Sequence, residues 1–153
     1  MAVKPIPDGF RTITPYLIVN DAAAALAFYR DALQAEVTLQ LDMPDGKIAH
    51  AELRIGDSRL MVSDEWPGMN KLSPTSRGGA TGGIALYVED ADAWFERAIK
   101  AGATETQPMR DEFYGDRTGQ VDDPFGHSWT FATHREDVSQ AEMQKRMDEM
   151  MKG

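Results

Sequence analysis

The residues in this sequence that are best suited to chemistry are a histidine and a glutamate separated by one position. His50 and Glu52 lie in residues 48–55, where apolar and polar side chains alternate as in a half-buried strand. A strand places both side chains on one face, about 7 Å apart. An imidazole beside a carboxylate is the composition of a general base that works near neutral pH. The alternative is that Glu52 pairs with Arg54 on a hydrated face and does no chemistry.

A second group of candidates combines two aromatic rings with one arginine. Phe113 and Tyr114 are adjacent, and Arg117 follows shortly after them. Near the mouth of a cavity, such residues suit a planar or anionic ligand, which they hold by stacking and by a forked hydrogen bond. The alternative is a bulged loop in which Arg117 pairs with Asp116 or Asp122. The sequence leaves both interpretations open.

The elements that must position these residues follow one order twice: a strand, a helix and three strands. The first set is expected at residues 11–19, 22–33, 36–42, 48–55 and 58–63, and the second at residues 83–88, 91–101, 103–110, 116–122 and 127–133. Asp21 is suited to cap the first helix. Residues between the two sets include several Pro and Gly breakers and are expected to form a linker.

A common offset between the two sets indicates an internal duplication. The pairs 69 positions apart are Leu17 and Leu86, Val19 and Val88, Asp21 and Asp90, and Asp57 and Gly126. Each βαβββ unit is too small to bury a core alone. The expected fold is therefore α+β, with two βαβββ modules that form curved mixed sheets, helices outside and concave faces turned inward. The alternative is that an α+β chain offers such matches by chance.

Composition and charge exclude several classes of function. The chain has 153 residues, with 16 Lys and Arg against 25 Asp and Glu and a net charge of −9. An acidic surface repels phosphate backbones and anionic lipid, so neither nucleic acid nor a membrane is an expected partner. With no cysteine there is no disulfide scaffold, thiolate zinc site or cysteine nucleophile. The longest apolar run, residues 22–29, is too short to span a bilayer, and residues 1–10 lack the apolar stretch of a secretory signal, so the expected location is the cytoplasm.

Strand alternation predicts which side chains face the cavity. Ile13, Leu17 and Val19 are expected to pack under the first helix, and Trp129 and Phe131 under the second. His127 and His134 are expected at the surface. The residues expected to face inward are Thr14, Tyr16, Ile18, His50, Glu52, Arg54, Arg59, Met61, Ser63, Gly83, Ala85, Tyr87, Ser128, Thr130 and Ala132.

Several motifs together resemble a known superfamily over about residues 11–135. They are residues 15–21 leading to Phe28-Tyr29, and residues 50–56, 60–64, 87–92 and 123–129, the last beginning with Asp-Pro-Phe-Gly before a strand. The sequence is similar to the vicinal oxygen chelate superfamily, which includes glyoxalase, bleomycin- and fosfomycin-resistance proteins and extradiol dioxygenases. It most resembles the bacterial glyoxalase-like branch, whose activity is unassigned.

The resemblance implies where a metal would be bound in this fold. Metal-dependent members carry His or Glu on the first and last strand of each module, and these positions correspond here to Thr14, Met61, Gly83 and Thr130. Glycine has no side chain, methionine is too soft for the usual divalent ions, and a threonine hydroxyl binds weakly. We therefore predict no cofactor, and a divalent metal only if it binds away from these positions.

The expected organisation is one glyoxalase-like domain followed by a helix. Residues 1–135 form the domain, with module one at 11–64, a linker at 65–82 and module two at 83–135, and residues 136–153 form an amphipathic helix. Ser139 and Glu142 are spaced as a capping box. The helix stripe consists of Met143, Met147, Met150 and Met151. Such a stripe must be covered, either by the chain's own sheet or, as in dimeric members of the superfamily, by a second subunit; a homodimer is expected.

The expected function is to bind a small organic ligand in the cavity between the modules, without the usual metal. The expected cavity residues are Thr14, Tyr16, Met61, Ser63, Gly83, Tyr87, Tyr114, Arg117 and Thr130. One alternative is a lyase or isomerase of a small oxygenated metabolite, with His50 or Glu52 as the base or with a metal bound off the usual positions. Another is an interaction module that uses the acidic surface and the C-terminal stripe.

Overall fold

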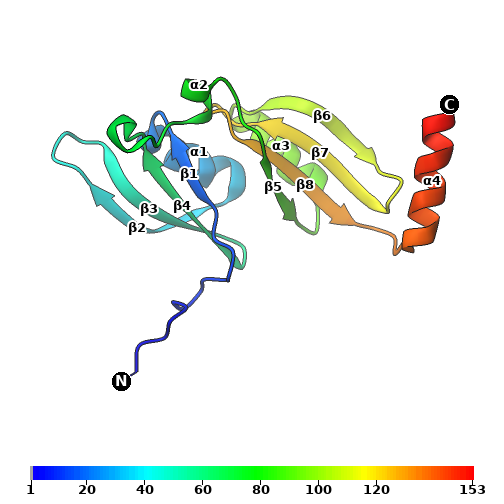
Figure 1. Cartoon of the computed structure of the whole chain (residues 1–153), viewed down its shortest axis with the longest axis horizontal. Coiled ribbons are helices and arrows are strands. Elements are labelled where there is room, and N and C mark those ends of the chain that lie inside the picture. Colours follow the sequence, from blue (N-terminus) through cyan, green and yellow to red (C-terminus); the bar gives the residue numbers. More distant parts are fainter. Residues whose placement is uncertain (1) are drawn as a thin grey trace.

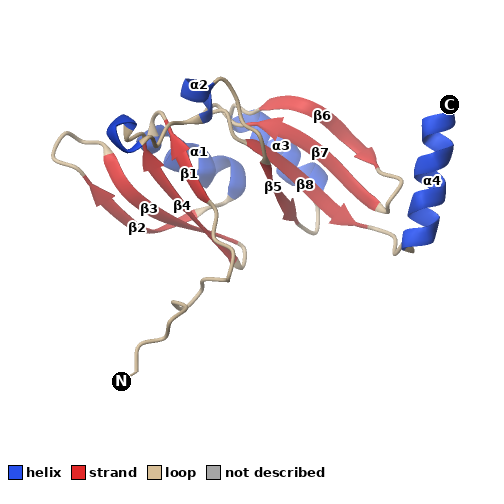
Figure 2. Ribbon diagram, viewed as in Figure 1, coloured by secondary structure: helices blue, strands red, loops and turns tan. Residues whose placement is uncertain are grey.

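A computed structural model describes residues 2–153 and contains two βαβββ modules and a C-terminal helix (Figures 1 and 2). Module one comprises β1 (Tyr16–Val19), α1 (Ala22–Leu33), β2 (Glu36–Asp42), β3 (Ile48–Ile55) and β4 (Ser58–Asp64). The connection contains η1 (Pro67–Met69) and α2 (Pro74–Arg77). Module two comprises β5 (Gly83–Tyr87), α3 (Ala91–Ala101), β6 (Thr104–Asp111), β7 (Asp116–Asp122) and β8 (Ser128–His134), and is followed by α4 (Gln140–Lys152). The predicted α+β fold is confirmed.

The two sheets share one topology, which supports the duplication. Their strand orders are β1-β4-β3-β2 and β5-β8-β7-β6. In each sheet the first and last strands of the module are parallel and the other neighbours are antiparallel. Tyr16 pairs with Met61 in module one, and Ala85 pairs with Thr130 in module two. The residues of the second pair follow those of the first pair by 69 positions each, which is the offset found in the sequence.

Each sheet buries one face under its helix and leaves the other face open. The predicted cap is present, because the Asp21 side chain accepts a hydrogen bond from the Ala24 amide at 3.0 Å. Val19 is fully buried in the core of module one, and Trp129 and Phe131 are buried in module two, as alternation predicts. Both helices lie behind their sheets in Figure 1, so the open faces of the two sheets look to the same side.

The modules are joined by helix packing and by the Asp-Pro-Phe-Gly turn. Helix α1 of module one contacts α3 of module two. Asp123, at the start of the turn, is buried. Its carboxylate accepts hydrogen bonds from Tyr29 Oη (2.6 Å), Trp129 Nε1 (2.9 Å), the Phe125 amide (2.9 Å) and the His127 amide (3.0 Å). Burial, followed by the neighbouring Asp123 charge, raises the pKa of the Tyr29 hydroxyl, which therefore stays protonated and donates.

This packing corrects the expected placement of the sheets. The concave faces do not turn toward one another within the chain; the sheets lie next to each other along its long axis (Figure 2). The strand expected at 11–19 begins only at Tyr16. Ile13, which was expected to pack under the first helix, is 84% exposed. Pro15 explains part of this difference, because proline has no amide hydrogen to donate to a sheet.

Candidate functional site

The open face of module one carries a hydrogen-bonded row of three side chains. Tyr16 Oη lies 2.8 Å from His50 Nδ1, and His50 Nε2 lies 3.3 Å from Glu52 Oε1. Because a carboxylate only accepts, the Nε2–H donates to Glu52; in the neutral imidazole, Nδ1 is then the acceptor for the Tyr16 hydroxyl. Arg54 does not pair with Glu52 as the alternative required; it contacts Glu36. The predicted same-face placement of His50 and Glu52 is therefore present, and Tyr16, also expected on the inward face, completes the row.

A hollow of about 470 Å³ lies beside this row, under the N-terminal segment. Glu52 lines it, together with Thr14 and Met61. The other lining residues are Pro5, Ile6, Pro7, Phe10, Arg11 and Thr12. Glu52, unlike His50, is therefore the member of the row whose side chain borders this space.

A bulge in β2 makes the open face of module one more apolar. Val37 pairs with Leu53, but the register shifts after it, so that Leu39 pairs with Glu52 and Leu41 with His50. Paired residues in a sheet project to the same face. Leu39 and Leu41 are therefore placed on the open face, where both are exposed.

A second hollow, of about 290 Å³, lies where module one meets the linker. Its lining includes Tyr16, Ile18, the glycine-rich segment 79–82 and His127. His127 Nε2 lies 2.9 Å from the Ile18 carbonyl oxygen. The expectation that His127 faces solvent is wrong, because the Asp123 turn directs its ring across to module one.

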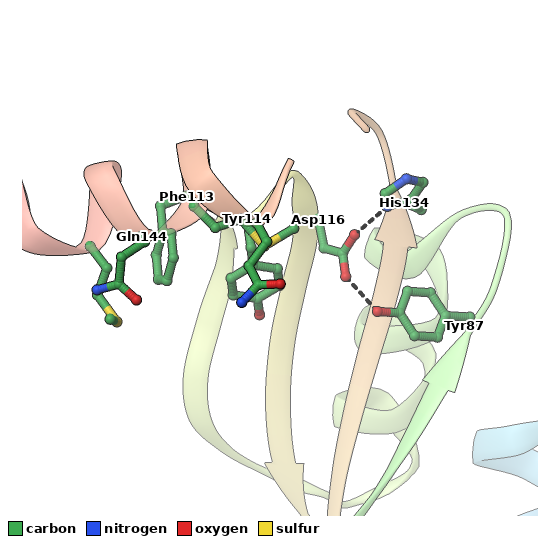
Figure 3. A pocket seen from close by; sticks show the side chains of 9 residues that line it. Tyr87, Phe113, Tyr114, Asp116, His134 and Gln144 are labelled. Carbon is green, nitrogen blue, oxygen red and sulfur yellow. Dashed lines mark hydrogen bonds and ion pairs between the residues drawn. The ribbon is translucent and has the colours of Figure 1, made fainter. Parts of the chain in front are cut away.

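A third hollow, of about 520 Å³, lies between the open face of module two and α4 (Figure 3). We call it the α4 pocket. Its lining residues are Tyr87, Phe113, Tyr114, Asp116, His134, Gln140, Met143, Gln144 and Met147. Tyr87 and Tyr114 are two of the expected cavity residues, and α4 contributes half of the methionine stripe, Met143 and Met147, to the lining.

The floor of the α4 pocket is a buried carboxylate held between a phenol and an imidazole. Tyr87 Oη donates to Asp116 Oδ2 at 2.6 Å, and His134 Nδ1 lies 2.7 Å from Asp116 Oδ1. His134 Nε2 lies 2.8 Å from Asp137. The hydrogen bonds to Asp137 and Asp116 raise the pKa of His134, and the hydrogen bond to Asp116 raises that of Tyr87.

Sequence reasoning missed this group because its members come from three different strands. His134 was expected at the surface; it is half-exposed, and its ring is tied to β7. From the sequence, Asp116 is expected only as a possible ion-pair partner of Arg117. Two signals were available. Alternation in β7 places Asp116 on the same face as Thr118. Tyr87 and His134 lie at the ends of β5 and β8, which are neighbouring parallel strands.

Two other expected cavity residues lie elsewhere. Arg117 projects from the opposite face of β7, toward the helix, where its guanidinium donates to Asp92 at 2.7 and 2.9 Å and to Asp111 at 3.3 Å. This pair lowers the pKa of Asp92. Arg117 therefore takes neither the expected place at a cavity mouth nor the alternative pairing with Asp116 or Asp122. Ser63 is buried and donates to the Asp64 carbonyl.

The four positions that correspond to family metal ligands are divided between the two sheets. Thr14 and Met61 border the module-one hollow, whereas Gly83 and Thr130 lie on β5 and β8. Two hydroxyls, one thioether and one glycine do not supply the anionic or imidazole donors that a hard divalent ion requires. Within residues 2–153, no three His, Cys, Asp or Glu side chains are grouped so that they could hold a metal ion. The residues present do not fit the metal.

No helix within residues 2–153 has both the length and the apolar character that a membrane crossing requires.

Comparisons with known proteins agree on a single family. The model of the Glyoxalase/Bleomycin resistance protein/Dioxygenase superfamily matches residues 10–131. An uncharacterized protein of Mycobacterium tuberculosis is 42% identical over 138 residues, which cover 88% of this chain and 81% of the relative.

Solved structures of this family show the same fold. TioX from Micromonospora sp. ML1 is 28% identical, with a TM-score of 0.63 over 81% of this chain and 98% of TioX. A variant of the fosfomycin resistance protein FosX from Listeria monocytogenes, solved in complex with Mn(II), is 19% identical, with a TM-score of 0.60 over 88% of this chain and 94% of FosX. At that identity the likeness to FosX supports the fold alone.

Proposed function

The chain belongs to the Glyoxalase/Bleomycin resistance protein/Dioxygenase superfamily, and on that premise we propose that it binds a small organic ligand on the open faces of its sheets. The proposal includes a cytoplasmic location and the absence of the divalent metal used by other members. The observation that carries it is the α4 pocket, a hollow of about 520 Å³ walled by aromatic and methionine side chains. Ligand sites are of this size and are lined mainly by apolar groups around a few fixed polar ones.

The proposal of a metal-free site rests on donor chemistry. Metal-dependent members carry His or Glu at positions that correspond here to Thr14, Met61, Gly83 and Thr130, and this chain has no such ligand at any of them. Ligand binding then depends on shape, aromatic contact and the fixed polar groups of the open faces.

We expect protein purified without added ion to contain less than about 0.1 equivalent of Zn, Ni, Mn or Fe and still to bind a ligand. At one hundred times its Kd, a ligand adds about 2.7 kcal/mol of stability. For a chain of this length, that raises the melting temperature by roughly 5–10 °C. Elemental analysis and a thermal-shift screen of aromatic and ionic metabolites measure the two quantities.

Chelator-treated protein provides the control and should give the same shifts. Stoichiometric metal, or shifts that disappear with chelator, would contradict the metal-free site. A screen without any shift would contradict ligand binding.

We also propose that the protein is a homodimer in which a second copy covers the open faces. The support is the apolar character of these faces: Tyr87 is 68% exposed and Leu41 is 54% exposed. Apolar side chains gathered on one face of a protein commonly mark an interaction surface. A second copy presents the same side chains and would enclose the hollows that are open in one chain.

Light scattering after gel filtration should give about twice the chain mass of 17.0 kDa. Leu41→Asp places a charge on the open face and should shift the protein to monomer, because burial of an unpaired carboxylate is costly. Met150→Asp, near the end of α4, is the matched control and should remain dimeric. A monomeric wild-type protein would refute the proposal, and dissociation by Met150→Asp alone would move the interface to α4.

A second candidate function is a lyase or isomerase, favoured by the row Tyr16–His50–Glu52. In this arrangement Glu52 borders the hollow and can accept a proton, while His50 holds the Glu52 carboxylate and Tyr16 holds the His50 ring. Conversion of a compound during the screen, lost in His50→Ala, would favour this enzyme over a binding protein.

A further inference from the structure

We propose that the α4 pocket is specific for an apolar amine bound in its ammonium form. This inference rests on the proposed ligand binding and adds the chemical class of the ligand at one of the hollows. It follows from the direction of the hydrogen bonds at the pocket floor and from the composition of its walls.

The α4 pocket is separate from the positions that correspond to family metal ligands in module two. Tyr87 and His134 lie four residues beyond Gly83 and Thr130 on the parallel strands β5 and β8. Four residues of a strand span about 13 Å. The pocket therefore has its own polar groups at the far end of the open face.

The hydrogen bonds at the floor leave acceptors and no free donors. An ionised Asp116 can only accept, so the Tyr87 hydroxyl proton points to it and the Tyr87 oxygen keeps its lone pair for another partner. Both nitrogens of His134 face carboxylates, those of Asp116 and Asp137, so both N–H groups are in use. A ligand that meets these atoms must therefore bring the donor, as an ammonium group does.

The charge of the floor also favours a cation. An imidazolium at His134 between two carboxylates leaves one negative charge in excess, and the lining of the pocket contains no Lys or Arg. Arg146, also on α4, is engaged by Glu136 and Glu142 and donates to the Phe113 carbonyl. Its charge is thus already paired outside the lining. A carboxylate ligand would face Asp116 in a lining that offers no Lys or Arg.

The walls suit the apolar body of such an amine. Figure 3 shows Asp116 between Tyr87 and His134, with Phe113 and Tyr114 farther along the pocket. Aromatic faces attract an ammonium ion, and the thioethers of Met143 and Met147 are polarizable and adapt to the shape of a ligand. The same walls offer little to a small hydrophilic amine.

The test is calorimetric titration of the full chain with three probes that share one body: 4-phenylbutylamine, 4-phenylbutanol and 4-phenylbutyrate. The amine, which is an ammonium ion at neutral pH, should bind at least about tenfold more tightly than either analogue. Tyr87→Leu should weaken the amine by about tenfold, because it removes both the acceptor and the ring.

A pair of variants on α4 tests the role of charge. Met147→Lys adds a cation to the pocket lining, at a side chain that is 39% exposed, and should weaken the amine by at least about tenfold without weakening 4-phenylbutyrate. Met151→Lys adds the same charge on the same helix, outside the lining, at a side chain that is 82% exposed, and should change the affinity less than about twofold.

The outcomes separate this inference from the proposed function. Equal binding of the alcohol or the carboxylate, or equal effects of Met147→Lys and Met151→Lys, would overturn the ammonium specificity and leave ligand binding intact. No binding by any of the three probes would also overturn it, whereas only an empty thermal-shift screen would overturn the proposed function.

Discussion

Asp123→Ala is expected to lower the free energy of unfolding by about 3–5 kcal/mol. The buried carboxylate accepts four hydrogen bonds, two of them from backbone amides of its own turn. The other two come from the Tyr29 hydroxyl in α1 and the Trp129 indole in β8. Its removal leaves buried donors unsatisfied and breaks one of the contacts that join module two to module one.

Urea denaturation at constant pH measures this loss. Asp122→Ala, one residue earlier, removes a carboxylate that is less buried and accepts from the Ser128 hydroxyl, and it should cost less than about 1 kcal/mol. Tyr29→Phe removes one of the four donors and should cost about 1–2 kcal/mol. Equal losses for Asp122→Ala and Asp123→Ala would show that the turn does not lock the modules together.

Local signals in the sequence predict most of the secondary structure. Helix α1 occupies the expected residues 22–33 because Asp21 caps it and an apolar stripe follows. The same local reasoning fails before β1, where Pro15 delays the strand to Tyr16. Boundaries are thus predictable wherever a cap or a turn residue acts through its immediate neighbours.

The placement of the modules was not predictable by this route. Alternation tells which side chains share a face, but it does not tell where the second sheet lies. That placement depends on long-range contacts, such as the packing of α1 against α3 and the hydrogen bond between Tyr29 and Asp123, which are 94 positions apart. The Asp-Pro-Phe-Gly turn resembles a family motif in the sequence, but its role in joining the modules depends on a partner in α1 that is distant along the chain.

The candidate sites show the same division between local and long-range information. The shared face of His50 and Glu52 follows from strand period alone. The opposite projections of Asp116 and Arg117 also follow from that period, because the two residues are adjacent in β7. Bringing Tyr87 to Asp116 and His134 required knowledge that β5 pairs with β8, two strands that are far apart in the sequence.

Gly115→Ala is expected to destabilise the protein by about 2–4 kcal/mol and to open the α4 pocket. Gly115 has φ +99°, and an added Cβ would overlap the Glu136 carbonyl oxygen and crowd Val138. The Gly115 carbonyl also accepts hydrogen bonds from the amides of Arg135 and Glu136 at 3.0 Å each. The substitution therefore pushes away the segment that leads into α4, which forms one wall of the pocket.

Gly46→Ala is the matched control, because Gly46 has φ +87° and nothing lies within 4 Å of an added Cβ. Gly46→Ala introduces the backbone strain of a positive φ without the steric overlap, and it should lower the free energy of unfolding by about 1 kcal/mol. Urea denaturation measures both losses, and limited proteolysis should show new cleavage between β8 and α4 in Gly115→Ala alone. If the two variants lose equal stability and resist protease equally, the connection after β8 tolerates displacement. The packing of α4 against module two would then not depend on Gly115.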